Sequence, residues 1–170
     1  MSDVSIRAAR AEDLSTIARF AAELVRFHYA IDPKRFLCVD GLEKGYERYL
    51  TGELRSEGVV LLAAEADGKL CGYVYARIEP RNWNDLLESC GKIHDIYVDP
   101  NARRQSVGRR LLERAVHDLE ALGAPRVVLL TAAQNEEAQH LFASFGFRTT
   151  MLEMTREAVK PPQNAPSSHS

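Results

Sequence analysis

The chain has 170 residues, 45% of them hydrophobic, and a formal net charge of −2. This length and apolar fraction suffice for one domain with a substantial core, and the mildly acidic balance excludes a globally basic nucleic-acid-binding protein. The three cysteines are odd in number and widely spaced, the first residues lack a signal-peptide pattern, and no apolar run approaches the ~20 residues of a membrane span, so we expect a reduced, cytoplasmic protein without a disulfide framework, a zinc site or a membrane partner.

The N-terminal third is predicted to form a strand and two helices. Residues 4–7 alternate in hydropathy as a strand does, and residues 12–28 carry apolar side chains every three or four positions, as in an amphipathic helix. Asp32 and Pro33 end that helix. A second helix, roughly residues 41–55, contains three glycines. We expect it to be weak and mobile, because each interior glycine costs about 1 kcal/mol relative to alanine.

Three strands follow in the middle of the chain. Residues 59–66 and 70–79 flank an Asp-Gly pair, which is a strong signal for a hairpin. Gly72, inside the second of these strands, indicates a bulge or the close approach of another backbone. After a loop that contains the single tryptophan, residues 93–98 are rich in β-branched and aromatic side chains and form the next strand.

The C-terminal part is predicted to contain two helices and two or three strands. Residues 107–122 have the pattern of an amphipathic helix, and residues 126–131 that of an apolar strand covered on both faces. Asn135 suits the N-cap of a further helix, which Gly146 ends. Residues 147–156 have room for one or two last strands.

Together these elements predict an α/β fold with a central, twisted, mixed sheet of six to seven strands and about four helices on both faces. The strand–helix–strand unit at residues 93–131 is expected to be a right-handed parallel crossover. We expect one domain over residues 1–157 and a disordered tail over residues 158–170, because the tail has few apolar side chains to bury.

One stretch combines a strand, a polar turn and the start of a helix, which is the arrangement of an anion-binding cradle. It runs from Gly91 to Leu112. The free N–H groups of a helix's first turn carry about half a positive charge, and four arginines gather at the same end: Arg103, Arg104, Arg109 and Arg110. Cations are unfavourable at the positive end of a helix dipole, so this cluster favours a multiply charged phosphate ligand.

This stretch resembles the acyl-CoA-binding motif of the GNAT superfamily of N-acetyltransferases, whose pattern is Gln/Arg-x-x-Gly-x-Gly/Ala after a strand that ends in Val-x-Pro. Here Val98-Asp99-Pro100 precedes Arg103-Arg104-Gln105-Ser106-Val107-Gly108, with Ser106 in place of the first glycine. A second family element runs from Asn135 to Phe147 at the expected distance, with Phe142 where the family usually has tyrosine. The ordered pair of motifs covers the chain from about residue 60 to residue 150.

The resemblance implies that acetyl-CoA is the cofactor, with its pyrophosphate on the loop and its pantetheine arm along a free strand edge. In the family, that edge opens because the fourth and fifth strands splay apart. The expected cofactor-binding residues belong to the strand edge, the loop and the second motif: Ile96, Tyr97, Val98, Arg103, Arg104, Gln105, Ser106, Val107, Gly108, Arg109, Asn135 and Phe142. For Asn135, a role as N-cap alone is an equal alternative, and the two roles are compatible.

Ser106 allows two interpretations. At a positive φ, serine would add roughly 1 kcal/mol of strain relative to glycine, and a loop altered in this way would bind CoA poorly. At a negative φ, the hydroxyl can donate to a phosphate oxygen. We favour the negative φ, because Gly108 remains where the backbone must pass closest to the ligand.

Acetyl transfer to an amine needs the free base, so a proton acceptor is expected beside the thioester. His94 and Asp95 lie on the strand next to that position, on opposite faces, and Asp95 matches the Glu-Asp-x-x-Val run of diamine acetyltransferases. Either residue is a candidate proton relay, and either is equally explained as a packed polar residue. Phe142 cannot protonate the departing thiolate, as the family's tyrosine is proposed to do. This leaves Tyr97, a water molecule, or unassisted departure of a thiol with a pKa of about 8.5.

The amine site should be built by the first two helices and the loop before the fourth strand. Aromatic rings and carboxylates in these segments suit a cationic amine, although ordinary packing accounts for such residues equally well. The candidates are His28, Tyr29, Asp32, Phe36, Glu79 and Trp83.

The sequence therefore predicts an N-acetyltransferase that moves the acetyl group of acetyl-CoA to a primary amine of a small molecule. We expect direct attack in a ternary complex, because neither motif contains a cysteine. The nearest enzymatic alternative has a protein or peptide amine as acceptor. The alternative from another class is a low-turnover acyl-CoA-binding or sensing module, supported by Ser106 and Phe142. A homodimer paired through its C-terminal strand is a further possibility.

Overall fold

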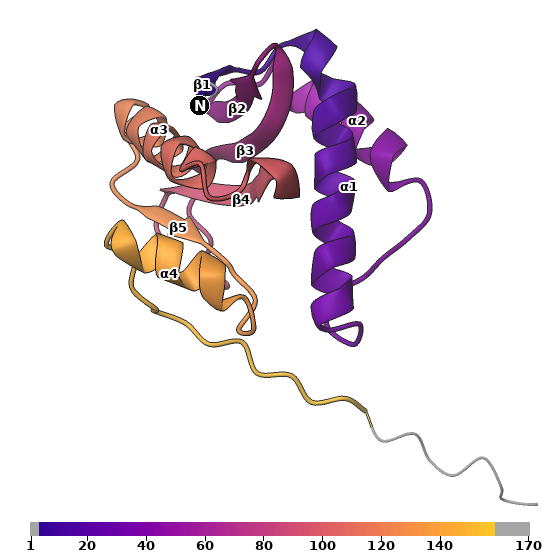
Figure 1. The fold of residues 1–170 in the computed structure, drawn as a ribbon. Helices are drawn as coiled ribbons and strands as arrows, with labels where there is room; N and C mark the ends of the chain where they lie inside the picture. The colour runs from indigo at the N-terminus through magenta and orange to yellow at the C-terminus, as the bar shows by residue number, and fades with distance from the viewer. Residues whose placement is uncertain (1–3, 159–170) are drawn as a thin grey trace, which may run out of the picture.

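The computed structural model describes residues 4–158 and contains one sheet with the strand order β1-β2-β3-β4-β5 (Figure 1). The first four strands are antiparallel to their neighbours, and β5 runs parallel to β4. The predicted mixed sheet and the parallel arrangement of its last two strands are therefore confirmed. The strands are β1 (Val4–Ala8), β2 (Val59–Ala66), β3 (Lys69–Glu79), β4 (Cys90–Val98) and β5 (Val127–Leu129).

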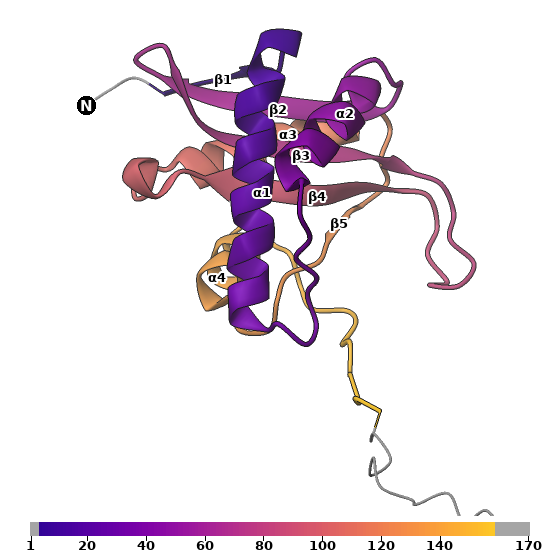
Figure 2. The same cartoon turned by 90° about the vertical axis from the view of Figure 1, so that its right-hand side faces the viewer.

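Helices cover both faces of this sheet, as predicted (Figures 1 and 2). On one face, α1 and α2 enclose a core that includes Phe20 and Tyr73. On the other face, α3 and α4 pack against a second core that includes Leu111 and Phe142. The described α-helices are α1 (Leu14–Ile31), α2 (Leu42–Glu53), α3 (Val107–Ala121) and α4 (Glu136–Ser144), with short 3-10 turns η1 (Ala11–Asp13) and η2 (Pro100–Ala102).

The sheet has five strands, not the predicted six to seven. Residues 147–158 form no strand, although their sequence predicts one or two. A strand needs a neighbour to complete its hydrogen bonds, and the edge strand β5 is only three residues long. The side chains of Met151, Leu152 and Met154 are accordingly 77%, 81% and 91% exposed. Pairing of this segment across a two-fold axis of a homodimer stays a prediction.

The predicted tail lies outside the described residues, apart from residue 158. The proposed domain boundary at residue 157 therefore stays a prediction. Within residues 4–158, no helix has the length and apolar character needed to cross a membrane.

Two irregularities shape the centre of the sheet. The β2–β3 register shifts next to Gly72, and a Cβ atom at Gly72 would lie 2.7 Å from the carbonyl oxygen of Tyr97. Such a contact is repulsive, so only glycine fits, and both the bulge and the close approach predicted there are confirmed. A second register shift, between β3 and β4, leaves His94 without an opposite residue on β3.

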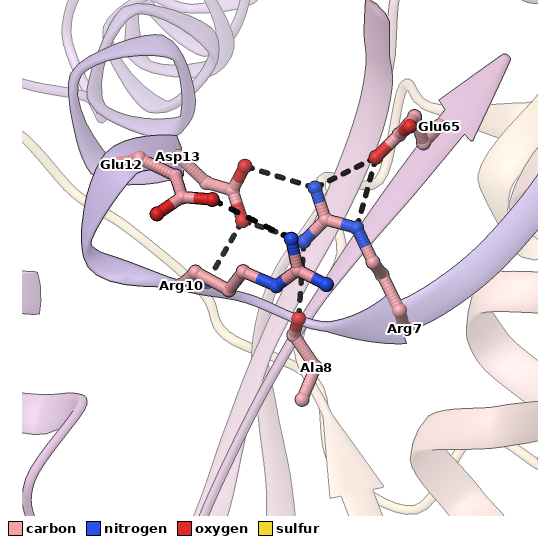
Figure 3. Close-up of polar contacts among 6 residues, drawn as sticks. All are labelled: Arg7, Ala8, Arg10, Glu12, Asp13 and Glu65. Carbon is pink, nitrogen blue, oxygen red and sulfur yellow. Dashed lines mark hydrogen bonds and ion pairs between the residues drawn. The ribbon is translucent and has the colours of Figure 1, made fainter. Parts of the chain in front are cut away.

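A charged cluster fixes the start of α1 to the sheet, and we call it the Asp13 clamp (Arg7, Asp13 and Glu65; Figure 3). Arg7 of β1 donates from Nη1 and Nη2 to the two carboxylate oxygens of Asp13, at 2.7 and 3.0 Å, and from Nε to Glu65 of β2, at 2.9 Å. The backbone N–H of Arg10 also donates to Asp13, at 2.8 Å. Asp13 is only 6% exposed, and its hydrogen bonds from Arg7 lower its pKa.

Candidate active site

β4 and β5 separate partway along their length. Their pairing covers only Gly91 to Ile93 of β4, opposite Val127 to Leu129 of β5. On its other side, β4 stays paired with β3 as far as Val98. Residues 94–98 of β4 therefore have one edge with no strand beside it in the described part of the chain. The splayed strands that the resemblance implies are confirmed, and their free N–H and C=O groups can pair with a ligand.

The loop from β4 into α3 is strained. Ser106 has a φ of +60° and Arg104 a φ of +64°, so both are left-handed. The prediction of a negative φ at Ser106 is wrong, because the turn that starts α3 at Val107 reverses the chain through left-handed residues. Each such non-glycine residue costs about 1 kcal/mol or more. The hydroxyl of Ser106 makes no capping hydrogen bond that would offset this cost.

Glycine at position 106 should therefore raise the free energy of unfolding by about 1 kcal/mol, since glycine adopts a positive φ at little cost. The measurement is urea denaturation of Ser106→Gly beside the wild-type protein. Ser106→Ala is the matched control, because it removes the same hydroxyl but keeps the Cβ atom, and it should bring no gain. A Gly variant less stable than the wild type would show that the serine side chain stabilises the loop.

A groove of about 460 Å³ opens where the two strands separate. The predicted cofactor-binding residues line it with one exception, Gln105, whose side chain is exposed outside it. The lining thus brings together the free edge of β4, the arginine-bearing loop, the first turn of α3 and one side of α4. Side chains of α1 and α4 that the sequence analysis did not single out complete the wall: Leu24, Phe27, Glu137, Ala138 and Leu141.

The four arginines of the motif have different surroundings. Arg103 and Arg104 line the groove and form no ion pair within residues 4–158. Arg109 lines it too, but donates to Oγ of Ser144 at 3.1 Å. Arg110 instead lines a separate hollow beside β1. The positive charge available to a ligand in the groove therefore comes mainly from Arg103 and Arg104.

α4 contributes an amide and an aromatic ring to the groove. Oδ1 of Asn135 accepts the N–H of Ala138 at 3.2 Å, which confirms the N-cap. Its amide nitrogen makes no hydrogen bond within the described residues and remains free to donate to a ligand. Phe142 lines the groove and is 6% exposed, packed against Phe147 with ring centroids 6.0 Å apart. The lining therefore has no hydroxyl at this point.

His94 and Asp95 lie on the same face of the sheet, so the prediction of opposite faces is wrong. The register with β3 passes from Asp95 directly to Ile93, which makes His94 the extra residue of a β-bulge and interrupts the alternation of side chains. The ring of His94 stacks on Tyr75, with centroids 5.2 Å apart. Oδ2 of Asp95 accepts a hydrogen bond from the hydroxyl of Tyr73 at 3.1 Å.

The electrostatic environment of these residues differs. Burial raises the pKa of Asp95, although the hydrogen bond from Tyr73 and the nearby His94 and His28 act to lower it. By contrast, Nε2 of His94 lies 2.8 Å from Oε1 of Glu79, and both side chains are about one-third exposed. Two titratable groups on one face thus have different access to water.

Tyr97 is held by α1. Its ring stacks on Phe20, with centroids 5.0 Å apart, and its hydroxyl donates to the carboxylate of Glu23. Burial and this hydrogen bond raise the pKa of Tyr97. Loss of its proton would place a phenolate beside a carboxylate, so Tyr97 is a poor proton donor. The sequence analysis missed Glu23, because nothing in the helical pattern distinguishes it from the other polar residues of α1.

Three of the predicted acceptor residues lie near this face. The rings of His28 and Phe36 are in contact, with centroids 5.0 Å apart. His28 is close enough to Asp95 to affect its pKa, and Glu79 contacts His94. Tyr73 and Tyr75, which the sequence analysis missed, complete the polar cluster (His28, Tyr73, Tyr75, Glu79, His94 and Asp95). Their signal in the sequence is the alternation of tyrosines along β3.

The structure does not bring the other predicted acceptor residues into the polar cluster. Asp32 accepts the N–H groups of Lys34 and Arg35 and so shapes the loop after α1. Tyr29 is 42% exposed, and Trp83 is 73% exposed with Arg81 over its ring. In the described residues, neither ring contacts the polar cluster.

Solved structures share this arrangement of strands and helices. The BH1408 protein of Bacillus halodurans superposes with a TM-score of 0.78 at 17% identity, over 91% of this chain and 99% of its own. The aminoglycoside N-acetyltransferase AAC(6')-Iy, solved in complex with CoA, superposes with a TM-score of 0.71 at 17% identity, over 93% and 96% of the two chains. The fold is therefore one that acyl-CoA-dependent N-acetyltransferases use.

The sequence gives the family directly. A model described as the acetyltransferase (GNAT) family matches residues 23–147, and the chain belongs to this family. Mycothiol acetyltransferase of Thermomonospora curvata is 31% identical over 101 residues, which are 59% of this chain and 32% of that protein. The chain thus spans about a third of the length of that relative. The L-amino acid N-acyltransferase MnaT of Escherichia coli is 26% identical over 147 residues, 86% of this chain and 81% of its own.

Proposed function

We propose that this protein transfers the acetyl group of acetyl-CoA to a primary amine of a small molecule. The groove between the separated strands carries the proposal, because it joins a free strand edge to a helix N-terminus with unpaired cations. Acetyl-CoA, the acyl donor of this family, is long, carries amides along its pantetheine arm and ends in phosphates. Each of these features has a counterpart in the groove.

The residues of the groove fit this donor in order. The free edge of residues 94–98 supplies N–H and C=O groups that can pair with the two pantetheine amides, as a neighbouring strand would. The first turn of α3, which begins at Val107, supplies unsatisfied N–H groups and a favourable dipole for a pyrophosphate. Arg103 and Arg104 add two cations there, and the free amide of Asn135 faces the same groove.

Direct attack by the amine is the reaction that this site supports. The groove lining contains no cysteine: Cys71 and Cys90 are buried elsewhere, and Cys38 is exposed in the loop after α1. The thioester placed along β4 would lie beside the bulge at His94. In our proposal the amine approaches from the polar cluster, and one of His94 and Asp95 takes its proton.

The leaving thiolate has no protein acid in this proposal. Phe142 lacks a hydroxyl, and that of Tyr97 already donates to Glu23. A thiol has an ordinary pKa of about 8.5, so its thiolate can depart unassisted and take a proton from water.

Tyrosine at position 142 should therefore leave turnover unchanged or raise it, because a hydroxyl at this part of the wall can protonate the leaving sulfur. The measurement is kcat for acetyl transfer by Phe142→Tyr, with thermal unfolding as a check on stability. Phe147→Tyr, the same change on the neighbouring ring outside the groove lining, should not raise kcat. A severe loss of kcat in a folded Phe142→Tyr variant would show that the apolar ring itself is required.

A small-molecule acceptor is favoured by the relatives. The similar proteins described above are named for mycothiol, for L-amino acids and, among the solved structures, for aminoglycosides. Aromatic rings and the carboxylates of Glu79 and Asp95 line the proposed approach, which suits an amine that is cationic in solution. A protein or peptide amine is the acceptor that the test must exclude.

A low-turnover acyl-CoA-binding module is the second candidate function. Two observations favour it: the groove lacks a hydroxyl at Phe142, and Ser106 strains the cofactor loop. Both would reduce catalysis while leaving a site in which CoA can still bind.

Thiol release from acetyl-CoA separates these functions. The purified protein is mixed with acetyl-CoA and a panel of amines that includes diamines, amino acids, amino sugars and lysine-containing peptides, and CoA binding is measured by calorimetry in parallel. Binding with thiol release for a small amine supports the proposal. Binding with no release for any amine supports the CoA-binding module, release with peptides alone supports a protein acceptor, and no binding overturns all three functions.

A further inference from the structure

We propose that His94 is the base that takes the proton from the acceptor amine, and that Glu79 is the positioning residue that keeps its imidazole in the required orientation and tautomer. This inference rests on the proposed acetyl transfer and assigns the proton acceptor within it. Four observations carry it: the bulge, the stacking on Tyr75, the contact with Glu79 and the exposure of the ring.

The bulge places His94 at the point where the free edge of β4 begins. Pairing with β5 ends at Ile93, so His94 is the first residue of β4 without a neighbour on that side. Its ring is held against Tyr75 at 5.2 Å with an interplanar angle of 23°, a stacked arrangement that limits rotation. A regular strand would have placed His94 and Asp95 on opposite faces. The bulge brings both onto the face of the polar cluster.

Glu79 determines which nitrogen is free. Oε1 of Glu79 lies 2.8 Å from Nε2 of His94, and a carboxylate can only accept at that distance. The neutral imidazole therefore carries its hydrogen on Nε2, and Nδ1 keeps its lone pair. Nδ1 makes no hydrogen bond within the described residues. It is the basic atom that the contact with Glu79 makes available.

Other charges maintain Glu79 as a carboxylate. Nε of Arg77 lies 3.9 Å from the same oxygen of Glu79, and Nη1 of Arg77 donates to Glu53 of α2 at 2.8 Å. Nε of Arg77 is buried without a hydrogen-bond partner, so its charge favours the ionised form of Glu79. Glu53 and Arg77 compensate each other, which leaves the charge of Glu79 for His94.

Asp95 is less suited to the same task. Oδ2 of Asp95 already accepts from Tyr73, and the carboxyl is enclosed by Tyr73 and the nearby His28. A proton that it received would have no direct route to water. His94, whose side chain is 31% exposed, can pass a proton on to solvent after each turnover. We therefore assign Asp95 to hold the face of the cluster and not to take the proton.

The proposed step balances as follows. Nδ1 of His94 takes one proton from the ammonium group and leaves a neutral amine. The nitrogen lone pair attacks the carbonyl carbon, a C–N bond forms, and the C–S bond breaks with its electron pair leaving on sulfur. The second proton of the amine ends on that sulfur through water and gives the CoA thiol. His94 then releases the first proton to solvent, so one proton is liberated for each acetyl group transferred.

The test compares wild-type protein, His94→Gln, Glu79→Gln and Asp95→Asn. We expect kcat/KM to fall about 100-fold in His94→Gln, as for loss of a general base, and about 10-fold in Glu79→Gln, with CoA affinity unchanged in both. In Glu79→Gln the acid limb of the kcat/KM profile should move to lower pH, because a neighbouring carboxylate favours the protonated imidazole. Glu57→Gln is the matched control: it removes the same charge from an exposed residue near β3 that makes no contact with His94, and it should change neither.

A readout that does not depend on catalysis completes the test. The titration of the His94 ring, followed by NMR, should have a lower midpoint in Glu79→Gln than in the wild type, and an equal midpoint would overturn the role of Glu79. Full activity in His94→Gln, or a loss in Asp95→Asn as large as in His94→Gln, would overturn the assignment of the base while leaving acetyl transfer in place. A wild-type protein that transfers acetyl to no amine would overturn the proposed function, with the base role included, whatever the NMR result.

Discussion

Alanine at both Arg103 and Arg104 should weaken CoA binding by about 100-fold, or ~2.7 kcal/mol. Both side chains line the groove without an ion-pair partner in the described residues, so their charges are available to the phosphates. A hydrogen bond between charged groups contributes about 1.5–3 kcal/mol, and the lower end applies to these exposed side chains. Calorimetry with CoA at low and at high salt measures the effect, and the loss of affinity on adding salt should be smaller in the double variant.

Arg110→Ala is the matched control for this experiment. Arg110 lies on the same helix as the groove residues but lines the hollow beside β1. The variant removes one positive charge from the same helix without touching the groove, so CoA affinity should stay within about twofold. An equal loss of affinity in both variants would indicate a general electrostatic effect. An unchanged affinity in the double variant would remove the loop from the cofactor site.

Alanine at Asp13 should lower the free energy of unfolding by about 3 kcal/mol. The change leaves the guanidinium of Arg7 with Glu65 alone in a poorly hydrated position and removes the acceptor of the Arg10 N–H. Breaking a buried ion pair from one side typically costs about 3–5 kcal/mol, and the partial exposure of Arg7, 23%, places this case at the lower end. Glu12→Ala is the control, because Glu12 is exposed and its contact with Arg10 is 3.4 Å long, so it should cost under about 0.5 kcal/mol.

The same pair predicts a pH dependence. The folded state lowers the pKa of Asp13, so the ionised carboxylate stabilises the fold at any pH above its ordinary pKa of about 3.9. This stabilisation is lost as the pH falls through that value toward the lower pKa of the folded state. The difference in unfolding free energy between wild type and Asp13→Asn should accordingly be constant near neutrality and shrink below about pH 4. A difference that does not change down to pH 2 would contradict the pairing with Arg7.

Much of the fold follows from local patterns. The hairpin at Asp67-Gly68, the amphipathic spacing of α3 and the N-cap at Asn135 each depend on residues close together in the chain, and each is confirmed. The last strands are not, because strand formation depends on a partner edge that local sequence does not describe. The three-residue length of β5 removes that partner within the described chain.

The cofactor groove could be predicted because its residues follow one another along a strand, a loop and a helix. The polar cluster could not, since its arrangement depends on which residue of β4 is left without an opposite residue on β3. That register places His94 beside Glu79 and Tyr75. The φ of Ser106 was missed for a related reason. The residue type is compatible with either sign, and the turn into α3 decides.

The Asp13 clamp also has a consequence for the evolution of acceptor choice. α1 is fixed to β1 and β2 at its first turn, while its last turn, with His28, reaches the polar cluster and the connection to α2 (Figure 2). Substitutions in residues 32–41 can therefore reshape the entrance for a new amine while the anchored end preserves folding. A lineage that diversified its acceptors would concentrate its sequence changes at that far end.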